Sequence, residues 1–425
     1  MRVDLIIRGG ICVSHRGQDR ADIAVRDGII VAFGDLGNLS AEKVIDGTGK
    51  YILPGVIDTE IYENELLGND SRAAVRGGVT SALFINSHLS NEKEFYCDYG
   101  YFEPATSTNE DQLSRLEQEE GCAGIFLSMS NTGNFEAFYD DRNLLNVLKN
   151  GSRRVVIHAE DQMKLDQRRN KIIEGDVKSH LAWHDEAVAI EATRRILAIA
   201  RGAGRPVHLM HISTDKEMAM VAAYKDISTA AVSPAHLLLS APDCYDHYLN
   251  YAKIDPPLRG EENRIGLWKA LSGGIVDILA SSHCPQAIEY KELTYPNCVS
   301  GIPSVQTMMP QMLDQVNKGS LSLQTLVDIT GAGPARVFNI ASKGRIAVGY
   351  DADFTIVELN SRWIYEDEDV DTACGWDLFA GSELTGQVTS TIIRGQEVMR
   401  DGRILSEPIG KTLKFYDNYK PYEDV

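Results

Sequence analysis

The 425-residue sequence has little positive charge, with 42 Lys and Arg against 61 Asp and Glu and a formal net charge of −19. Duplex nucleic acids and anionic membranes are bound by clustered Lys and Arg side chains, so we expect neither as a partner. The sequence also lacks an apolar run of about 20 residues, the length that a membrane-spanning helix requires. Solubility is a sufficient explanation of the acidity.

Paired cysteines are missing as well. The seven cysteines are odd in number and scattered, and none forms a C-x-x-C pair. This pattern indicates reduced thiols rather than a disulfide framework or a structural zinc finger. The first residues, MRVDLIIRGG, have no long apolar core and no small-residue cleavage site, so we expect no signal peptide. Together these features predict a cytoplasmic protein.

A glycine-rich dinucleotide motif, G-x-G-x-x-G, does not follow the first apolar stretch, so dinucleotide binding is unsupported. The middle of the chain instead contains about eight apolar, β-branched stretches, most of them separated by segments with helical spacing, as in a (β/α)8 TIM barrel. The stretches read YILPGVID, GVTSALFIN, CDYGYFEPA, AGIFLSM, RRVVIHAE, RPVHLMHIS, ISTAAVSP and GIVDILASS. A doubly wound open sheet is the alternative.

Both ends of the chain read as short strands with tight turns, such as the Asp27-Gly28 hairpin signal. We therefore predict an α/β protein in which a small composite β-sandwich is built from both termini. Residues 1–52 and 341–425 would form this domain and a polar surface tail, and residues 53–340 would form the barrel.

Two histidines follow adjacent predicted strands of the barrel, His158 in VVIHAE and His211 in HLMHIS. Residues just past the carboxyl ends of the strands line the mouth of such a barrel. Two imidazoles at neighbouring strand ends could hold a zinc ion, although a single histidine there is more often only hydrogen-bonded.

The order of several motifs resembles dihydroorotase and its cyclic-amidohydrolase relatives over nearly the whole chain. These motifs are LPGVID, SRAAVRGGVTS, DYGYFEPATSTNEDQL, SNTGNF, IHAED, HLMHIST, DPPLRGEENRIGLWKAL, SGIPSVQTMMP, GYDADFTIVEL and CGWDLFAG. The resemblance implies the barrel with a composite sheet. It also implies hydrolysis of a cyclic amide by two metal ions bridged by a carbamylated lysine, with an aspartate after the eighth strand as general base.

Several positions depart from the family's metal site. Glu60 and Tyr62 stand where the family has two histidines after the first strand, and Ile125 aligns with the bridging lysine. Ser282 stands at the position of the general base, whereas His158 and His211 are retained. The resemblance therefore predicts that the two-metal centre with a carbamylated lysine is absent.

The positions that would surround a substrate are altered too. Asn64 replaces the family's arginine, and Gln286 replaces the histidine that closes the strand-eight motif, where His283 is kept. Loss of the guanidinium removes a charge-assisted contact with an anionic substrate such as dihydroorotate. His236, after the seventh predicted strand, could line this vestigial pocket or be an ordinary hydrogen-bonded loop residue.

Two alternatives remain for the chemistry of the site. Glu60 could join His158 and His211 as a third ligand, which would make the expected cofactor a single zinc ion instead of none. His283 and Cys284 could form a base and a thiol nucleophile, but neighbours on a strand point to opposite faces.

We therefore predict a dihydroorotase-like protein that is non-hydrolytic by the family mechanism and serves assembly or regulation. The resemblance suggests aspartate carbamoyltransferase of pyrimidine synthesis as the partner, and a homo-oligomer is expected. The alternative is a cyclic amidohydrolase with an altered mononuclear metal site or another small ring or amide as substrate. An ordinary dihydroorotase with ligands from unexpected positions is a third interpretation.

Overall fold

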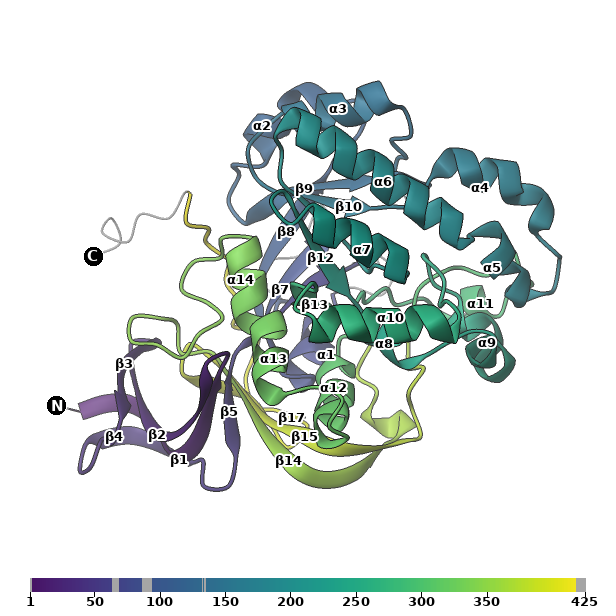
Figure 1. Cartoon of the computed structure of the whole chain (residues 1–425). Coiled ribbons are helices and arrows are strands. Elements are labelled where there is room, and N and C mark those ends of the chain that lie inside the picture. The colour runs from purple at the N-terminus through teal and green to yellow at the C-terminus, as the bar shows by residue number, and fades with distance from the viewer. Residues whose placement is uncertain (1, 63–68, 86–93, 132, 134, 418–425) are drawn as a thin grey trace.

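The computed structural model describes residues 2–62, 69–85, 94–131, 133 and 135–417. Two sheets organise the chain, and Figure 1 shows the small sheet beside the helix-covered barrel. None of the helices in these ranges is long and apolar enough to cross a membrane.

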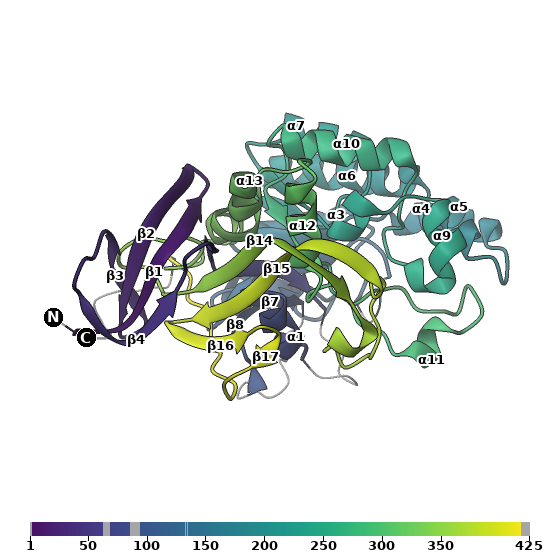
Figure 2. The same cartoon turned by 90° about the horizontal axis from the view of Figure 1, so that it is seen from below.

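The small sheet is built from both ends of the chain, as predicted, and Figure 2 shows its purple and yellow strands on the same side of the molecule. Its nine strands run in the order β17-β16-β15-β14-β5-β1-β2-β3, with β4 paired to β1. The strands are β1 (Arg2–Ser14), β2 (Gly17–Arg26), β3 (Ile29–Gly34), β4 (Ser40–Asp46), β5 (Tyr51–Pro54), β14 (Phe354–Tyr365), β15 (Ser382–Ile393), β16 (Gln396–Arg400) and β17 (Arg403–Ile404). The predicted hairpin at Asp27-Gly28 joins β2 and β3, and both of its residues have positive φ.

In the described residues the barrel consists of eight parallel strands in the order β13-β12-β11-β10-β9-β8-β7-β6, and each overlaps a stretch predicted from the sequence. Its strands are β6 (Val56–Ile61), β7 (Val79–Ile85), β8 (Asp98–Pro104), β9 (Cys122–Ser128), β10 (Val155–His158), β11 (Val207–Leu209), β12 (Ser228–Val232) and β13 (Ile278–Leu279). The seam between first and last strands is bridged by Tyr62 N–H donating to the His283 carbonyl at 2.8 Å and His283 N–H to the Glu60 carbonyl at 3.0 Å. The TIM-barrel prediction is confirmed.

The stretch YILPGVID serves both sheets. β5 pairs with β14 in the small sheet and ends at Pro54, and β6 begins the barrel at Val56. A Cβ at Gly55 would lie 2.2 Å from the Thr80 hydroxyl oxygen, so only glycine fits where the chain crosses between the sheets. The crossing lies at residue 55, slightly beyond the predicted boundary at residue 52.

Helices cover the outside of the barrel (Figure 1). They are α1 (Ser71–Arg76), α2 (Leu113–Leu116), α3 (Asp141–Lys149), α4 (Gln162–Arg168), α5 (His180–Trp183), α6 (Glu186–Ala203), α7 (Asp215–Ala223), α8 (Pro234–Leu238), α9 (Asp243–Tyr248), α10 (Glu261–Ser272), α11 (Ile288–Lys291), α12 (Met308–Asn317), α13 (Leu323–Val327) and α14 (Gly333–Val337). The longest of the described helices, α6, begins after Asp185, whose side chain caps it by accepting from the Val188 N–H.

Strand residues alternate between two hydrophobic layers. Ile125, Leu127 and Ile157 pack outward with helix residues such as Ile196. Phe126, Val156 and Met210 belong to a separate cluster that draws on seven of the described barrel strands and, through Met210, on the residue after β11. This alternation with a period of two decides which side chain of each strand end can face the mouth.

The tail from Lys411 onward was predicted to lie on the surface, and two of its described residues, Leu413 and Phe415, depart from that prediction. The Leu413 N–H donates to the Tyr99 carbonyl at 2.7 Å, and the Gly410 N–H donates to the Phe95 carbonyl at 2.8 Å. Leu413 and Phe415 are buried in the interior cluster of the barrel. Burial of these two side chains outweighs the polar character of their neighbours.

Candidate functional site

Four of the predicted positions meet at the mouth of the barrel. The Ser282 hydroxyl donates to Glu60 Oε2 at 2.6 Å, and the His211 backbone N–H donates to Glu60 Oε1 at 3.4 Å. His158 Nδ1 lies 3.3 Å from His211 Nε2. Glu60 comes from β6, His158 from the end of β10, and the other two from the segments after β11 and β13. We call these four residues the strand-end cluster.

Glu60 is fully enclosed, with 1% of its surface exposed. Burial raises the pKa of its carboxyl to about 8, and the nearby Asp58 adds to the shift, while the Ser282 hydrogen bond opposes it. Burial also raises the pKa of Asp58, whose Oδ1 accepts from the Ser281 N–H at 3.0 Å. Glu60 is therefore mostly protonated at neutral pH and a poor partner for a cation.

The two histidines form a hydrogen-bonded pair between His158 Nδ1 and His211 Nε2. On its other side His158 Nε2 lies 3.3 Å from Glu160 Oε2. Burial lowers the pKa of His211 well below its ordinary value, which keeps it neutral. His211 and Ser282 both adopt positive φ, of 29° and 53°, an uncommon backbone conformation that clusters at functional sites.

Aromatic rings fill the remaining space beside the cluster. Tyr62 contacts the rings of Phe126 and Phe135 edge-on, with centroids 6.5 and 6.1 Å apart, and its Oη lies 4.0 Å from Met210 Sδ. Phe126 and Phe135 are themselves 4.8 Å apart. These rings offer an incoming ion no strong donor beyond one phenol, and burial raises the pKa of that phenol well above 10.

The structure corrects the assignment of Ile125 to this pocket. Ile125 packs in the outer layer between strands and helices, and Phe126 is the β9 residue that faces Tyr62. A register one residue away reverses the face of every strand side chain, and a single aligned motif could not fix that parity. The pocket residue opposite Tyr62 is thus an aromatic ring.

Two other predicted pocket residues, His283 and His236, are hydrogen-bonded to neighbouring groups. His283 Nε2 donates to Asp70 at 2.8 Å while its Nδ1 accepts from the Ser304 N–H at 3.0 Å. His236 bonds Ser233 Oγ at 2.9 Å and the Pro256 carbonyl at 3.1 Å, and burial lowers its pKa to about 4. Both histidines therefore have structural partners at each nitrogen.

Gln286 donates to Cys284 Sγ at 3.3 Å, and burial raises the pKa of this thiol to about 11. A thiol with a raised pKa is a weak nucleophile at neutral pH. His283 is held by Asp70 instead of the cysteine, so the proposed base and thiol pair is not formed. Asn64 lies outside the described residues.

The family's two-metal centre does not fit these residues. Two ions need several donors at short range, and the position facing Tyr62 is Phe126, which has none. The spacing of the histidine nitrogens matches two ligands on one tetrahedral ion, which lie about 3.3 Å apart. Glu60 does not complete such a site, because it is absent from the His, Cys, Asp and Glu groups of the described residues whose ligand atoms converge within 4.8 Å.

Residues that the sequence analysis overlooked extend the cluster. Glu160 Oε1 lies 2.9 Å from His184 Nδ1, and His184 Nδ1 lies 3.8 Å from Asp255 Oδ1. Asp255 also bonds His180 Nε2 at 2.8 Å. The sequence signal for these residues is the spacing of four between His180 and His184, which places two histidines on one face of a helix.

The profile of the amidohydrolase family matches residues 134–398, and the chain belongs to this family. It is 30% identical over 396 residues to a dihydroorotase of Pyrococcus furiosus, with 87% of each chain covered. It is also 30% identical over 446 residues to an allantoinase of Rubrobacter xylanophilus, with 97% of each covered. The L-hydantoinase (dihydropyrimidinase) of Arthrobacter aurescens shares its fold with a TM-score of 0.91 at 25% identity, covering 97% of this chain and 99% of that one. The family resemblance is confirmed, and the three relatives differ in the activity that they are named for.

Proposed function

We propose that this protein is an amidohydrolase-family member that does not hydrolyse cyclic amides by the two-metal mechanism and that serves in assembly or regulation. The observation that carries this proposal is the contact of Tyr62 with Phe126 and Phe135, which occupies the mouth with rings. The shared fold supplies a rigid barrel for which catalysis is not required.

The chemistry of the strand-end cluster supports the same conclusion. A general base must accept a proton, and loss of such a group costs roughly 100- to 10,000-fold in rate. Ser282 has no basic group, and its hydroxyl is bonded to Glu60. Glu60 already holds a proton up to a pH of about 8. Neither residue can generate hydroxide as a carboxylate beside a metal would.

The proposed partner is aspartate carbamoyltransferase, on the strength of the resemblance to dihydroorotase-like chains that act as its non-catalytic subunit. The net charge of −19 leaves nucleic acids and anionic membranes out of the proposal. The protein is also expected to form a homo-oligomer. Light scattering of the purified protein alone and mixed with the transcarbamoylase of the same organism tests both statements, and additive masses at micromolar concentrations would contradict the partnership.

The enzymatic test uses dihydroorotate, allantoin and hydantoin, the compounds after which the relatives are named. Each is incubated with the metal-free protein and with protein supplied with Zn²⁺, Co²⁺ or Mn²⁺, and ring opening is followed. We expect no turnover above buffer. The matched control is an active family member assayed beside it, and opening of any of these rings near that enzyme's rate would refute the proposal.

The second candidate function is hydrolysis by an altered mononuclear site. The 3.3 Å spacing of His158 Nδ1 and His211 Nε2 favours it, because a single zinc ion could be held by both. This candidate predicts about one zinc ion per chain that is lost when His158 or His211 is replaced. Metal retained in those variants would exclude it.

A further inference from the structure

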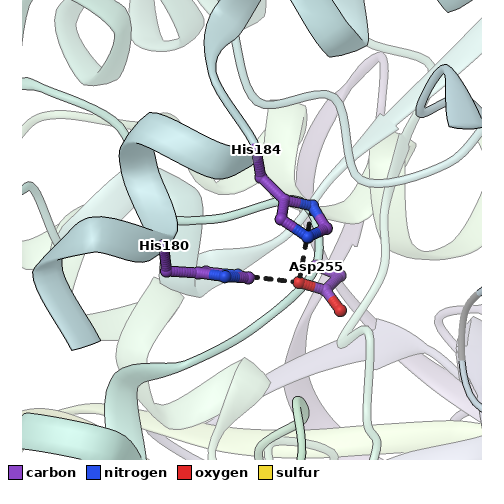
Figure 3. Close-up of side chains that lie close together, drawn as sticks. All are labelled: His180, His184 and Asp255. Carbon is purple, nitrogen blue, oxygen red and sulfur yellow. Dashed lines mark hydrogen bonds and ion pairs between the residues drawn. The ribbon is translucent and has the colours of Figure 1, made fainter. Parts of the chain in front are cut away.

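A second group of potential metal ligands lies outside the strand-end cluster. His180 begins α5 and His184 follows its last residue, so the two imidazoles are one helical turn apart. Asp255 comes from the segment between β12 and α10 and approaches both rings (Figure 3). We call these three residues the His-His-Asp cluster.

The distances suit a single ion. Asp255 Oδ1 lies 2.8 Å from His180 Nε2 and 3.8 Å from His184 Nδ1, and ligand atoms of all three residues lie within 4.8 Å of one another. Bonds of 2.0–2.1 Å in a tetrahedral zinc site place ligand atoms about 3.3 Å apart. The two measured separations from Asp255 Oδ1, 2.8 and 3.8 Å, lie on either side of that spacing.

Burial and charge favour a cation at this position. The side chain of His180 is fully buried, and those of His184 and Asp255 are only 7% and 16% exposed. Glu160, also fully buried, adds a second carboxylate 2.9 Å from His184 Nδ1. Asp255 and Glu160 thus bring two carboxylates to the two imidazoles, and a divalent ion would take the place of the proton that an imidazole shares with them.

The described residues contain one other converging group of this kind, and it differs in having a lysine at its centre. Asp98, Asp351 and Asp353 also converge, but the Lys343 ammonium sits among them at 2.6, 2.8 and 2.6 Å. That group already holds its cation. The His-His-Asp cluster has two imidazole nitrogens and an oxygen, a donor set that suits zinc and related transition metals.

A pocket of about 380 Å³ adjoins the cluster and is lined by Leu181, Asp185, Glu186, Ala187, Arg259 and Gly260. Leu181 follows His180 in α5, and the Arg259 guanidinium donates to the His184 carbonyl. An ion bound to the cluster would therefore join the segment around α5 to the segment before α10 and hold two walls of the pocket together.

We propose that His180, His184 and Asp255 bind one divalent ion of the zinc class, which ties α5 to the segment before α10. The site is separate from the family's metal position, because Glu160 stands between His158 and His184. The bound ion acts as a structural clamp of the pocket wall. This role does not depend on whether the strand-end cluster catalyses hydrolysis.

The test is metal binding by the full-length protein. Protein stripped with a chelator is titrated with Zn²⁺, and bound metal is measured by elemental analysis. A separate stripped sample is titrated with Co²⁺, whose visible absorption reports tetrahedral coordination. We expect about one ion per chain, with affinity reduced roughly 100-fold or more in His180→Gln and Asp255→Asn. The matched control His247→Gln changes an exposed histidine outside both clusters and should bind as the parent does. His211→Asn tests the rival position at the strand ends and should also bind the ion.

A thermal scan with and without Zn²⁺ keeps the proposal testable if one variant folds poorly. Zn²⁺ should raise the melting temperature of the parent and of His211→Asn but leave Asp255→Asn unchanged. No saturable binding by the parent would overturn the proposal. So would metal lost from His211→Asn and kept by His180→Gln and Asp255→Asn, a result that would assign the ion to the strand ends. Ring opening is measured separately, so the proposed function and the clamp fail independently.

Discussion

Ser282 and Glu60 are joined by a 2.6 Å hydrogen bond across the seam where the first and last strands of the barrel meet. The two positions carry a metal ligand and the general base in the family that this chain resembles. Here one is a buried carboxyl with a raised pKa and the other a hydroxyl that stabilises it. The seam is thus crossed by a side-chain hydrogen bond as well as by the backbone bonds of Tyr62 and His283.

Glu60 predicts a stability that falls with rising pH. Its folded pKa is about 8, and an unfolded glutamate titrates near 4.3. Between these values the folded state binds more protons than the unfolded state, so the free energy of unfolding decreases by as much as about 5 kcal/mol as the pH rises through this range. Above pH 8 the contribution is flat. Urea unfolding of the parent and of Glu60→Gln at pH 5, 7 and 8.5 measures how the free energy of unfolding changes with pH.

The Glu60→Gln variant should lose that part of the pH dependence, because glutamine does not titrate. Glu42, whose side chain is 63% exposed, provides the control, and Glu42→Gln should follow the parent. Identical slopes for the parent and Glu60→Gln would show that Glu60 is ionised in the folded protein.

Ser282→Asp restores the residue type of the family's general base. We expect no ring opening from this variant, since Phe126 still stands where a metal ligand would be needed. The new carboxylate faces Glu60, so the repulsion should also destabilise the fold by roughly 1–3 kcal/mol at pH 8. Ser282→Ala is the control for loss of the hydroxyl alone. Turnover of dihydroorotate by Ser282→Asp would contradict this expectation. It would show that serine at position 282 is by itself the reason for the lack of activity.

Phe126→Ala should lower the free energy of unfolding by about 3–5 kcal/mol, because the ring fills the barrel interior against Tyr62 and Phe135. Phe33, which is 43% exposed, gives a matched control, and Phe33→Ala should cost under about 0.5 kcal/mol. Guanidinium unfolding of both variants checks the difference. Equal losses would contradict the inward placement of Phe126.

Lys343→Met should destabilise the protein by about 3–5 kcal/mol, because it leaves the carboxylates of Asp98, Asp351 and Asp353 without their buried cation. The exposed Lys318, which pairs with Asp314, offers the comparison, and Lys318→Met should change stability by less than about 1 kcal/mol. Thermal unfolding at neutral pH separates the two. A Lys343→Met protein as stable as the parent would show that the buried ion pairs contribute nothing net.

The alternation of strands and helices was readable from the sequence because each strand of a parallel barrel is a short apolar run. All eight predicted stretches overlap a barrel strand, and the meeting of His158 with His211 followed from their places at adjacent strand ends. The face of a strand residue was harder to predict. Ile125 and Phe126 are both apolar neighbours, and only the pairing register decides which one faces inward.

The sequence by itself determined the barrel and the composite sheet, because both depend on periodicity along the chain. The departure from the family's metal ligands depends on residue type at motif positions and stays a prediction. The tertiary structure decided which groups touch. It placed Phe126 against Tyr62, Lys343 among three aspartates, and Asp255 between His180 and His184. Those contacts join residues far apart in the chain, and the closure of the sheets and loops around the barrel, which no local pattern encodes, brings them within bonding distance.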